Sequence, residues 1–196
     1  MATEPAAIVL AAGRSTRMGE VNKLIADVEG VPMVRRVVEA ALASRASAVL
    51  VVTGHEAGEV GVALAGLDVR LVHNCDFADG LATSLRAGVA AVPADSGGAV
   101  VLLGDMPGID AAAIDALLAA FSASGGRRIV AATAAGKRGN PVVWPAALFD
   151  ALGAVTGDTG GRPLLERHEV LTVEIGAAAR HDIDTPEDLA RLSGTA

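Results

Sequence analysis

Glycines, hydroxyl side chains and cations crowd together near the start of the chain in a pattern that suits phosphate chemistry. Residues 10–19 read LAAGRSTRMG, and Asn22-Lys23 follows shortly after. A glycine after a strand lets backbone N–H groups approach a bound anion, and fixed cations supply the opposite charge. The stretch therefore predicts a phosphate-binding loop, with a flexible surface loop carrying solvated arginines as the alternative.

Aspartates elsewhere in the chain could hold a metal ion beside those phosphates. Asp105 follows residues 98–103, the most apolar run of the sequence, while Asp182 and Asp184 alternate near its end. Mg²⁺ prefers oxygen ligands and takes few protein carboxylates when phosphates also bind it. Alternate residues of an extended segment point to opposite faces, so only one of Asp182 and Asp184 should face the metal. Capping of a turn or helix N-terminus is the alternative interpretation.

A third polar stretch, residues 80–88, reads GLATSLRAG and opens a predicted helix. Thr83 and Ser84 lie in its first turn, where N–H and hydroxyl groups could donate to a base, a ribose or a phosphate. The alternative is an ordinary amphipathic helix, since Leu81, Leu85 and Val89 form one apolar stripe.

Several common sites are missing from the sequence. Gly13 and Gly19 are too far apart for a GxGxxG dinucleotide fingerprint, and no GKS or GKT phosphate loop is present. Cys75 is the single cysteine, which excludes a disulfide framework and a cysteine-based zinc site. The histidines lack metal-ligand spacing and are interpreted as surface residues.

Composition limits the classes of partner. The 196 residues carry a formal net charge of −7, are 52% hydrophobic and only 2% aromatic. This length predicts one domain over residues 1–196 with a core of small side chains. The acidic balance argues against a nucleic-acid partner, because duplex binding needs a basic surface. No apolar run reaches the roughly 18 residues of a membrane span, and the start lacks a charged signal region, so we expect no membrane partner and a cytoplasmic location.

Alternating strands and helices must position these residues. Apolar runs predict strands at 6–10, 48–52, 69–72 and 98–103, and apolar stripes predict helices near 33–42, 57–64, 81–92 and 110–121. This alternation is typical of a parallel α/β sheet. The second half is less regular, with strands at 128–132, 141–144 and 170–175 around a loop at 135–140, and indicates a mixed sheet. Because ligands bind beyond the carboxyl ends of such strands, we expect the first loop and Asp105 to meet there.

The motifs together resemble a known family. LAAGRSTRMG, Asn22-Lys23, GLATSLRAG and LLGDMP at 102–107 are similar to nucleotidyltransferases of glycosyltransferase-A-like fold, and most of all to the molybdenum cofactor cytidylyltransferase branch of the MobA-like NTP transferases. The resemblance extends over nearly the whole chain. It implies a Rossmann-like, three-layer α/β/α sandwich with a mostly parallel mixed sheet, the nucleotide-diphospho-sugar transferase fold.

The resemblance also implies roles for individual residues. Arg17 would contact phosphates, Lys23 would bind the reacting phosphate, and Asp105 would bind Mg²⁺ with Asp182 or Asp184 completing the metal site. The residues that would contact the nucleotide are Leu10, Ala11, Ala12, Gly13, Arg14, Lys23, Thr83, Ser84 and Gly104. Loops that contain Arg138, Gly139, Asn140 and Arg162 are similar to those that hold the acceptor, with Arg162 on its phosphate.

The activity implied is magnesium-dependent nucleotidyl transfer from an NTP to a phosphorylated small-molecule acceptor, molybdopterin or molybdenum cofactor, with release of pyrophosphate. The acceptor's phosphate is already an anionic nucleophile, so the reaction needs charge stabilisation and positioning more than a general base. A molybdoenzyme or insertion chaperone that receives the product is an implied partner. Purine-using relatives commonly have a glycine where this chain has Ala12, so the resemblance favours CTP over GTP.

Three alternatives stay open at this stage. A guanylyltransferase of the same family would use GTP. A dinucleotide-binding oxidoreductase on a Rossmann-like sheet would need a fingerprint and an acidic ribose-binding residue, for which residues 53–56, TGHE, are a poor substitute. A non-catalytic cofactor chaperone would bind nucleotide without turnover.

Overall fold

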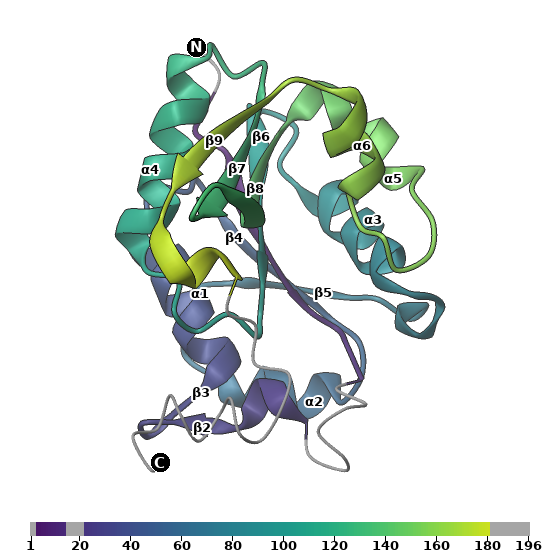
Figure 1. Ribbon diagram of the computed structural model, residues 1–196. Helices are drawn as coiled ribbons and strands as arrows, with labels where there is room; N and C mark the ends of the chain where they lie inside the picture. The colour runs from purple at the N-terminus through teal and green to yellow at the C-terminus, as the bar shows by residue number, and fades with distance from the viewer. Residues whose placement is uncertain (1–2, 15–21, 181–196) are drawn as a thin grey trace.

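Strand β1 (Ala6–Ala11) lies inside a seven-stranded sheet, in the order β5-β4-β1-β6-β8-β7-β9 (Figure 1). The structure is a computed structural model, which describes residues 3–14 and 22–180. Arg17, Asp182 and Asp184 of the predicted site lie outside the described residues. The remaining strands are β4 (Val49–Thr53), β5 (Arg70–His73), β6 (Gly98–Leu103), β7 (Ile129–Ala134), β8 (Lys137–Pro145) and β9 (Val170–Glu174).

Burial on both faces explains why β1 reads as a continuous apolar run. It pairs in parallel with β4 and with β6, and every one of its residues is buried. A parallel strand covered by helices on both faces cannot alternate apolar and polar side chains. The four strands predicted in the first half are therefore confirmed, with bounds shifted by one residue at most.

Helices cover both faces of the sheet and complete the three predicted layers. One face packs against α1 (Met33–Ala43), α2 (Ala57–Ala63) and α4 (Ala111–Ala123), and the other against α3 (Leu81–Ala91), α5 (Phe149–Gly153) and α6 (Arg162–Arg167) (Figure 1). Asp110 caps α4, because its Oδ1 accepts a hydrogen bond from the Ala113 N–H at 2.8 Å. The three-layer α/β/α fold with a mostly parallel sheet is confirmed.

The second half contains the antiparallel strand that makes the sheet mixed. β8 runs antiparallel to β6 on one side and to β7 on the other. The predicted loop at 135–140 is wrong, because the turn consists of Ala135 and Gly136, with φ of 50° and 73°, and β8 begins at Lys137. Two residues with positive φ close a tight hairpin whose twist matches its strands. Arg138, Gly139 and Asn140 therefore lie on a strand.

A small hairpin that the sequence did not indicate precedes α1. Strands β2 (Asp27–Val28) and β3 (Val31–Pro32) pair around Glu29 and Gly30, whose φ values are 53° and 85°. Pro32 thus belongs to the hairpin, and the helix begins after it. Leu42, near the end of α1, is 36% exposed.

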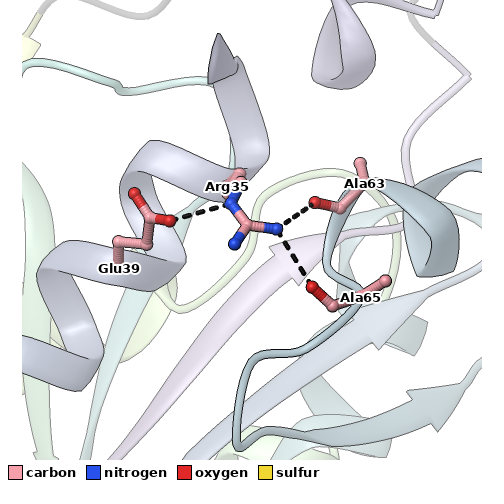
Figure 2. A network of polar contacts seen from close by, with 4 residues as sticks. All are labelled: Arg35, Glu39, Ala63 and Ala65. Atoms are coloured by element: carbon pink, nitrogen blue, oxygen red, sulfur yellow. Dashed lines mark hydrogen bonds and ion pairs between the residues drawn. The ribbon is translucent and has the colours of Figure 1, made fainter.

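Arg35 ties α1 to the end of α2 (Figure 2). Its Nε donates to Glu39 Oε1 at 2.8 Å, and its Nη1 donates to the carbonyls of Ala63 and Ala65 at 3.0 and 3.2 Å. The last carbonyls of a helix lack partners within the helix and attract a cation.

The loop before α2 reaches the end of β1, since the His55 N–H donates to the Ala12 carbonyl at 3.2 Å.

A carboxylate holds the β7–β8 turn to the end of β9. Glu174 accepts hydrogen bonds from Thr133 Oγ1 at 3.0 Å, from the Ala135 N–H at 3.1 Å and from the Gly176 N–H at 3.2 Å. Desolvation raises the pKa of the Glu174 carboxyl, but hydrogen bonds to its charged form outweigh that effect and hold the pKa below its usual value.

Glu174→Gln should therefore lower the stability of the fold near neutral pH. A lowered folded-state pKa adds stability that is present above the unfolded pKa of about 4.3 and is lost as pH falls through the folded value. The difference in unfolding free energy between wild type and variant should shrink in acid, which urea unfolding from about pH 7 to about pH 3 would measure. Glu169→Gln, at an exposed ion pair with Arg128, is the matched control. If the difference in unfolding free energy between wild type and Glu174→Gln stayed constant with pH, a lowered pKa of the Glu174 carboxyl would be contradicted.

Candidate functional site

The carboxyl ends of β1 and β6 meet and bring two predicted motifs together. Leu10 pairs with Leu103, and the Gly104 N–H donates to the Leu10 carbonyl at 3.0 Å. A Cβ at Gly104 would lie 3.1 Å from that carbonyl oxygen and 3.2 Å from Leu24 Cδ2, so the approach favours a glycine. Gly13 and Asp105, which follow the two strand ends, therefore line the same cavity.

Lys23 reaches Asp105 from a short 3₁₀ helix, η2 (Lys23–Ile25). Asn22 caps this helix, because its Oδ1 accepts a hydrogen bond from the Leu24 N–H at 3.0 Å. The cap orients Lys23 toward the strand ends, where its Nζ lies 2.6 Å from Asp105 Oδ2, with side-chain exposures of 13% and 18%. A mostly buried lysine and a mostly buried carboxylate thus form an ion pair beyond the carboxyl ends of β1 and β6.

The second oxygen of Asp105 suits a cation. Asp105 Oδ1 is buried and accepts no hydrogen bond from the residues that the structure describes. Over residues 3–14 and 22–180 no group of three or more His, Cys, Asp or Glu side chains gathers around a metal-sized site. One carboxylate is nevertheless enough for Mg²⁺, which keeps waters and takes phosphate oxygens. The residues present fit a divalent cation shared with a phosphate ligand.

A cavity of about 440 Å³, here called the first cavity, opens over this pair. Its lining includes most of the residues predicted to contact a nucleotide, namely Leu10, Ala12, Gly13, Arg14, Lys23 and Ser84, together with the predicted metal ligand Asp105. Ala11, Thr83 and Gly104 do not line it. Ala11 is buried at 1% exposure, and the Thr83 hydroxyl lies 2.9 Å from the Asp76 carbonyl and 2.8 Å from that of Gly80.

A second cavity, of about 470 Å³, adjoins the first. Arg138, Gly139, Asn140 and Arg162, the residues predicted to hold an acceptor, all line it. Its wall also includes Trp144, Leu165 and Glu166, and Arg138 Nη1 donates to the Leu165 carbonyl at 3.2 Å. The cavities share Leu10, Leu81, Leu103 and Asp158, which makes them two halves of one cleft.

The N-terminus of α3 is already occupied by the protein itself. The Leu81 N–H donates to Asp158 Oδ1 at 3.0 Å, the Ala82 N–H to the Gly157 carbonyl at 3.0 Å, and the Thr83 N–H to the Gly80 carbonyl at 3.1 Å. The expectation that these N–H groups are open to a ligand is therefore wrong. Two residues of this first turn, Leu81 and Ser84, line the first cavity, and Ser84 is the polar one.

Asp158 is a residue that the sequence analysis missed. Gly80 has a φ of 104°, and a Cβ there would lie 2.7 Å from Asp158 Oδ1 and 2.9 Å from the Gly157 carbonyl. The glycine-rich loop thus sits directly on α3 and divides the two cavities. The only signal in the sequence was an acidic residue between glycines, GDTGG at 157–161, which also fits a plain turn.

Phe77 is a second missed residue, at the end of the first cavity. A Cβ at Gly54 would lie 2.6 Å from Phe77 Cβ and 2.9 Å from Ala12 Cβ, so these three residues pack together. The Arg14 guanidinium carbon lies 5.4 Å from the Phe77 ring centroid, within the range of a cation–π contact. An aromatic ring therefore lies beside Ala12 in the cavity wall.

A family model described as the MobA-like NTP transferase domain matches residues 7–172. Nicotine blue oxidoreductase of Paenarthrobacter nicotinovorans is 30% identical over 200 residues, covering 94% of each chain. The bifunctional protein GlmU of Sorangium cellulosum (strain So ce56) is 35% identical over 167 residues, which cover 80% of this chain and 35% of that protein. The chain thus spans about a third of the length of this GlmU.

Two solved structures are similar to this chain over nearly its whole length. Rv0371c from Mycobacterium tuberculosis H37Rv superposes with a TM-score of 0.85 at 27% identity, covering 99% of this chain and 100% of that one. A second structure of Rv0371c, described as a complex with manganese, has a TM-score of 0.78 with the same identity and coverage. No helix among the described residues is both long and apolar enough to cross a membrane.

Asp158→Ala should destabilise the protein by about 1 kcal/mol, because the Leu81 N–H loses its acceptor. Asp158→Asn should cost less, since an amide oxygen can accept the same hydrogen bond. Denaturant unfolding would measure both, with the neighbouring Thr159→Ala as the control. If the asparagine variant lost as much stability as the alanine variant, the charge and not the hydrogen bond would hold the loop.

Proposed function

We propose that this chain, which belongs to the MobA-like NTP transferase family, transfers a nucleotidyl group from an NTP to a phosphorylated small-molecule acceptor and releases pyrophosphate. The observation that carries the proposal is the divided cleft. One half contains Lys23 and Asp105, and the other contains Arg138 and Arg162. Each half thus has two basic side chains that would bind an anionic substrate, Arg14 and Lys23 in the first and Arg138 and Arg162 in the second.

The proposed reaction needs no covalent intermediate with the protein. An oxygen of the acceptor's phosphate attacks the α-phosphorus of the NTP, the new P–O bond forms, and the bond to the bridging oxygen of the β-phosphate breaks. The electron pair leaves with pyrophosphate, and no proton needs to be removed from a phosphate that is already ionised. Lys23 and Arg14 would attract the triphosphate, while Arg138 and Arg162 would hold the acceptor's phosphate.

Asp105 would hold a divalent cation, and we propose Mg²⁺. Bound there, the cation supplies positive charge for the triphosphate and the leaving pyrophosphate. The buried, unsatisfied Oδ1 supports this role, and Asp182 or Asp184 stays the proposed second ligand. Arg17 stays a proposed phosphate contact. The manganese complex of Rv0371c supports divalent metal binding in a similar structure.

We propose CTP as the nucleotide and molybdopterin as the acceptor. The methyl group of Ala12 belongs to the wall of the first cavity and packs beside Phe77 and Gly54, which supports a tight limit on base size. The two arginines and the indole of Trp144 in the second cavity suit a flat heterocycle that carries a phosphate. A molybdoenzyme or insertion chaperone in the cytoplasm would then receive the product, and GTP is the alternative nucleotide.

A second candidate function is an oxidoreductase. It is favoured by the likeness to nicotine blue oxidoreductase over 94% of both chains. Trp144, the only tryptophan, lines the second cavity and gives a fluorescence signal for titration with NADPH or with CTP and Mg²⁺. Oxidation of NADPH with a dye acceptor, without dependence on any NTP, would favour this candidate.

The decisive experiment is to incubate the protein with each NTP, Mg²⁺ and molybdopterin and to measure pyrophosphate. We expect release that depends on all three components and is fastest with CTP. The proposal would be overturned if pyrophosphate appeared without an NTP, if its rate of release were the same with and without the acceptor, or if none were released.

Asp105→Ala should abolish metal-dependent transfer while the protein still folds, since a carboxylate at a strand end contributes more to function than to packing. We expect a loss of at least about a hundredfold in kcat. Asp68→Asn, at an exposed position, is the control for a changed surface charge. Wild-type turnover in excess chelator, or an active alanine variant, would contradict the assignment.

Ala12→Gly should relax the choice of base toward GTP. A methyl group in a pocket wall is worth roughly 1–3 kcal/mol, or about 10–200-fold in discrimination. The ratio of kcat/KM for CTP and GTP, measured with one acceptor, should therefore move toward unity without inverting. An unchanged ratio would place base choice elsewhere, and a wild type that already prefers GTP would overturn the cytidylyltransferase assignment.

A further inference from the structure

A buried asparagine lies between the end of β5 and the start of α3. Asn74 is 5% exposed, and its backbone N–H donates to the Thr53 carbonyl at 2.8 Å. The residue does not line either cavity. Its side chain instead contacts the first turn of α3, directly behind the wall of the first cavity.

The orientation of the Asn74 carboxamide is fixed by its surroundings. The Asp76 N–H donates to one end of the amide at 3.0 Å, and a backbone N–H can only donate, so that end is the oxygen. The Nδ2 group must then face α3, where it donates to Thr83 Oγ1 at 2.9 Å and to Ser84 Oγ at 3.0 Å. Both hydroxyl oxygens are therefore acceptors toward Asn74.

Because both hydroxyl oxygens accept a hydrogen bond from Asn74, each hydroxyl hydrogen must find an acceptor elsewhere, and the two hydroxyl groups differ in this respect. The Thr83 hydrogen has the carbonyls of Asp76 and Gly80 as acceptors. The Ser84 hydrogen finds no acceptor among the residues that the structure describes, although Ser84 is only 4% exposed and lines the first cavity. A buried hydroxyl without an acceptor costs free energy until a ligand supplies one.

We propose that Asn74 is a positioning residue that fixes the Ser84 hydroxyl as a hydrogen-bond donor into the first cavity, where it recognises a carbonyl oxygen of the nucleotide base. The inference rests on the proposed function and refines it. Ser84 is uncharged and has Leu10 and Leu81 as neighbours in the cavity wall, whereas Arg14 and Lys23 provide the charge that phosphates need. The O2 carbonyl of a pyrimidine is an acceptor that suits such a donor.

Asn74→Asp would reverse the polarity at almost constant shape. An ionised carboxylate still accepts from the Asp76 N–H, but its other oxygen can only accept from Thr83 and Ser84. The Ser84 hydrogen would turn away from the cavity, and its lone pairs would face the base carbonyl. Ser84→Ala removes the donor itself.

The test is calorimetric titration with Mg²⁺-CTP and, separately, with ribose 5-triphosphate, which has no base. We expect Ser84→Ala to weaken CTP binding by about threefold to tenfold and Asn74→Asp by about tenfold. Neither should change the affinity for ribose 5-triphosphate by a comparable factor. In the double variant the Asn74 substitution should add little, because its target is gone. Ser124→Ala, whose hydroxyl donates to the Phe121 carbonyl on α4, is the matched control.

Additive effects in the double variant would overturn the positioning role, and an equal loss for ribose 5-triphosphate would overturn recognition of the base. Melting temperatures report whether each variant folds. Because Asn74 is buried, the comparison of both ligands on Ser84→Ala decides the recognition step even if Asn74→Asp is unstable. A wild-type protein that binds no NTP would overturn the proposed function as well, whereas binding that these variants leave intact would overturn this inference alone.

Discussion

The hydrogen bond from the Gly104 N–H to the Leu10 carbonyl is the constraint on which the cleft depends. It continues the pairing of β1 with β6 just past the strand ends, so the loop after Leu10 and the carboxylate of Asp105 leave the sheet side by side. The cap at Asn22 then orients Lys23 toward the same point. Backbone pairing and one side-chain cap together thus bring the two opposite charges close to each other.

The cleft is divided because one loop serves both halves. Residues 157–161 contact the N-terminus of α3 through Asp158 and Gly157, and the same loop leads into Arg162 of the second cavity. Gly161 lies against the indole of Trp144, since a Cβ there would fall 2.4 Å from Trp144 Cζ2. The loop is therefore held between a helix and an aromatic ring, and it contributes to both halves of the cleft.

The fold was predictable where burial dictates the sequence pattern. The apolar runs of β1 and β6 allow one interpretation each, because helices cover both faces of these strands, and the stripe of α4 is equally clear because its four apolar side chains are buried on one face. The β2–β3 hairpin and the early start of β8 depend on positive φ at single residues such as Glu29 and Ala135, which composition does not reveal. Motif residues near strand ends, such as Lys23 and Asp105, could be named from the sequence. Asp158 and Asn74 could not, because each acts through a side-chain hydrogen bond to another element, which the sequence pattern does not reveal.

The place of β1 in the sheet also bears on how the chain reaches its native state. β1 is made first, yet Ala6 pairs with Ala99 and Ala7 with Val49, so its two neighbours arrive much later in synthesis. Such non-local pairing slows folding and leaves an apolar edge open to other chains in the meantime. A nascent chain that stops before β6 would have neither Asp105 nor a closed edge. Aggregation during synthesis, more than weak stability of the finished fold, is then the hazard that this topology brings.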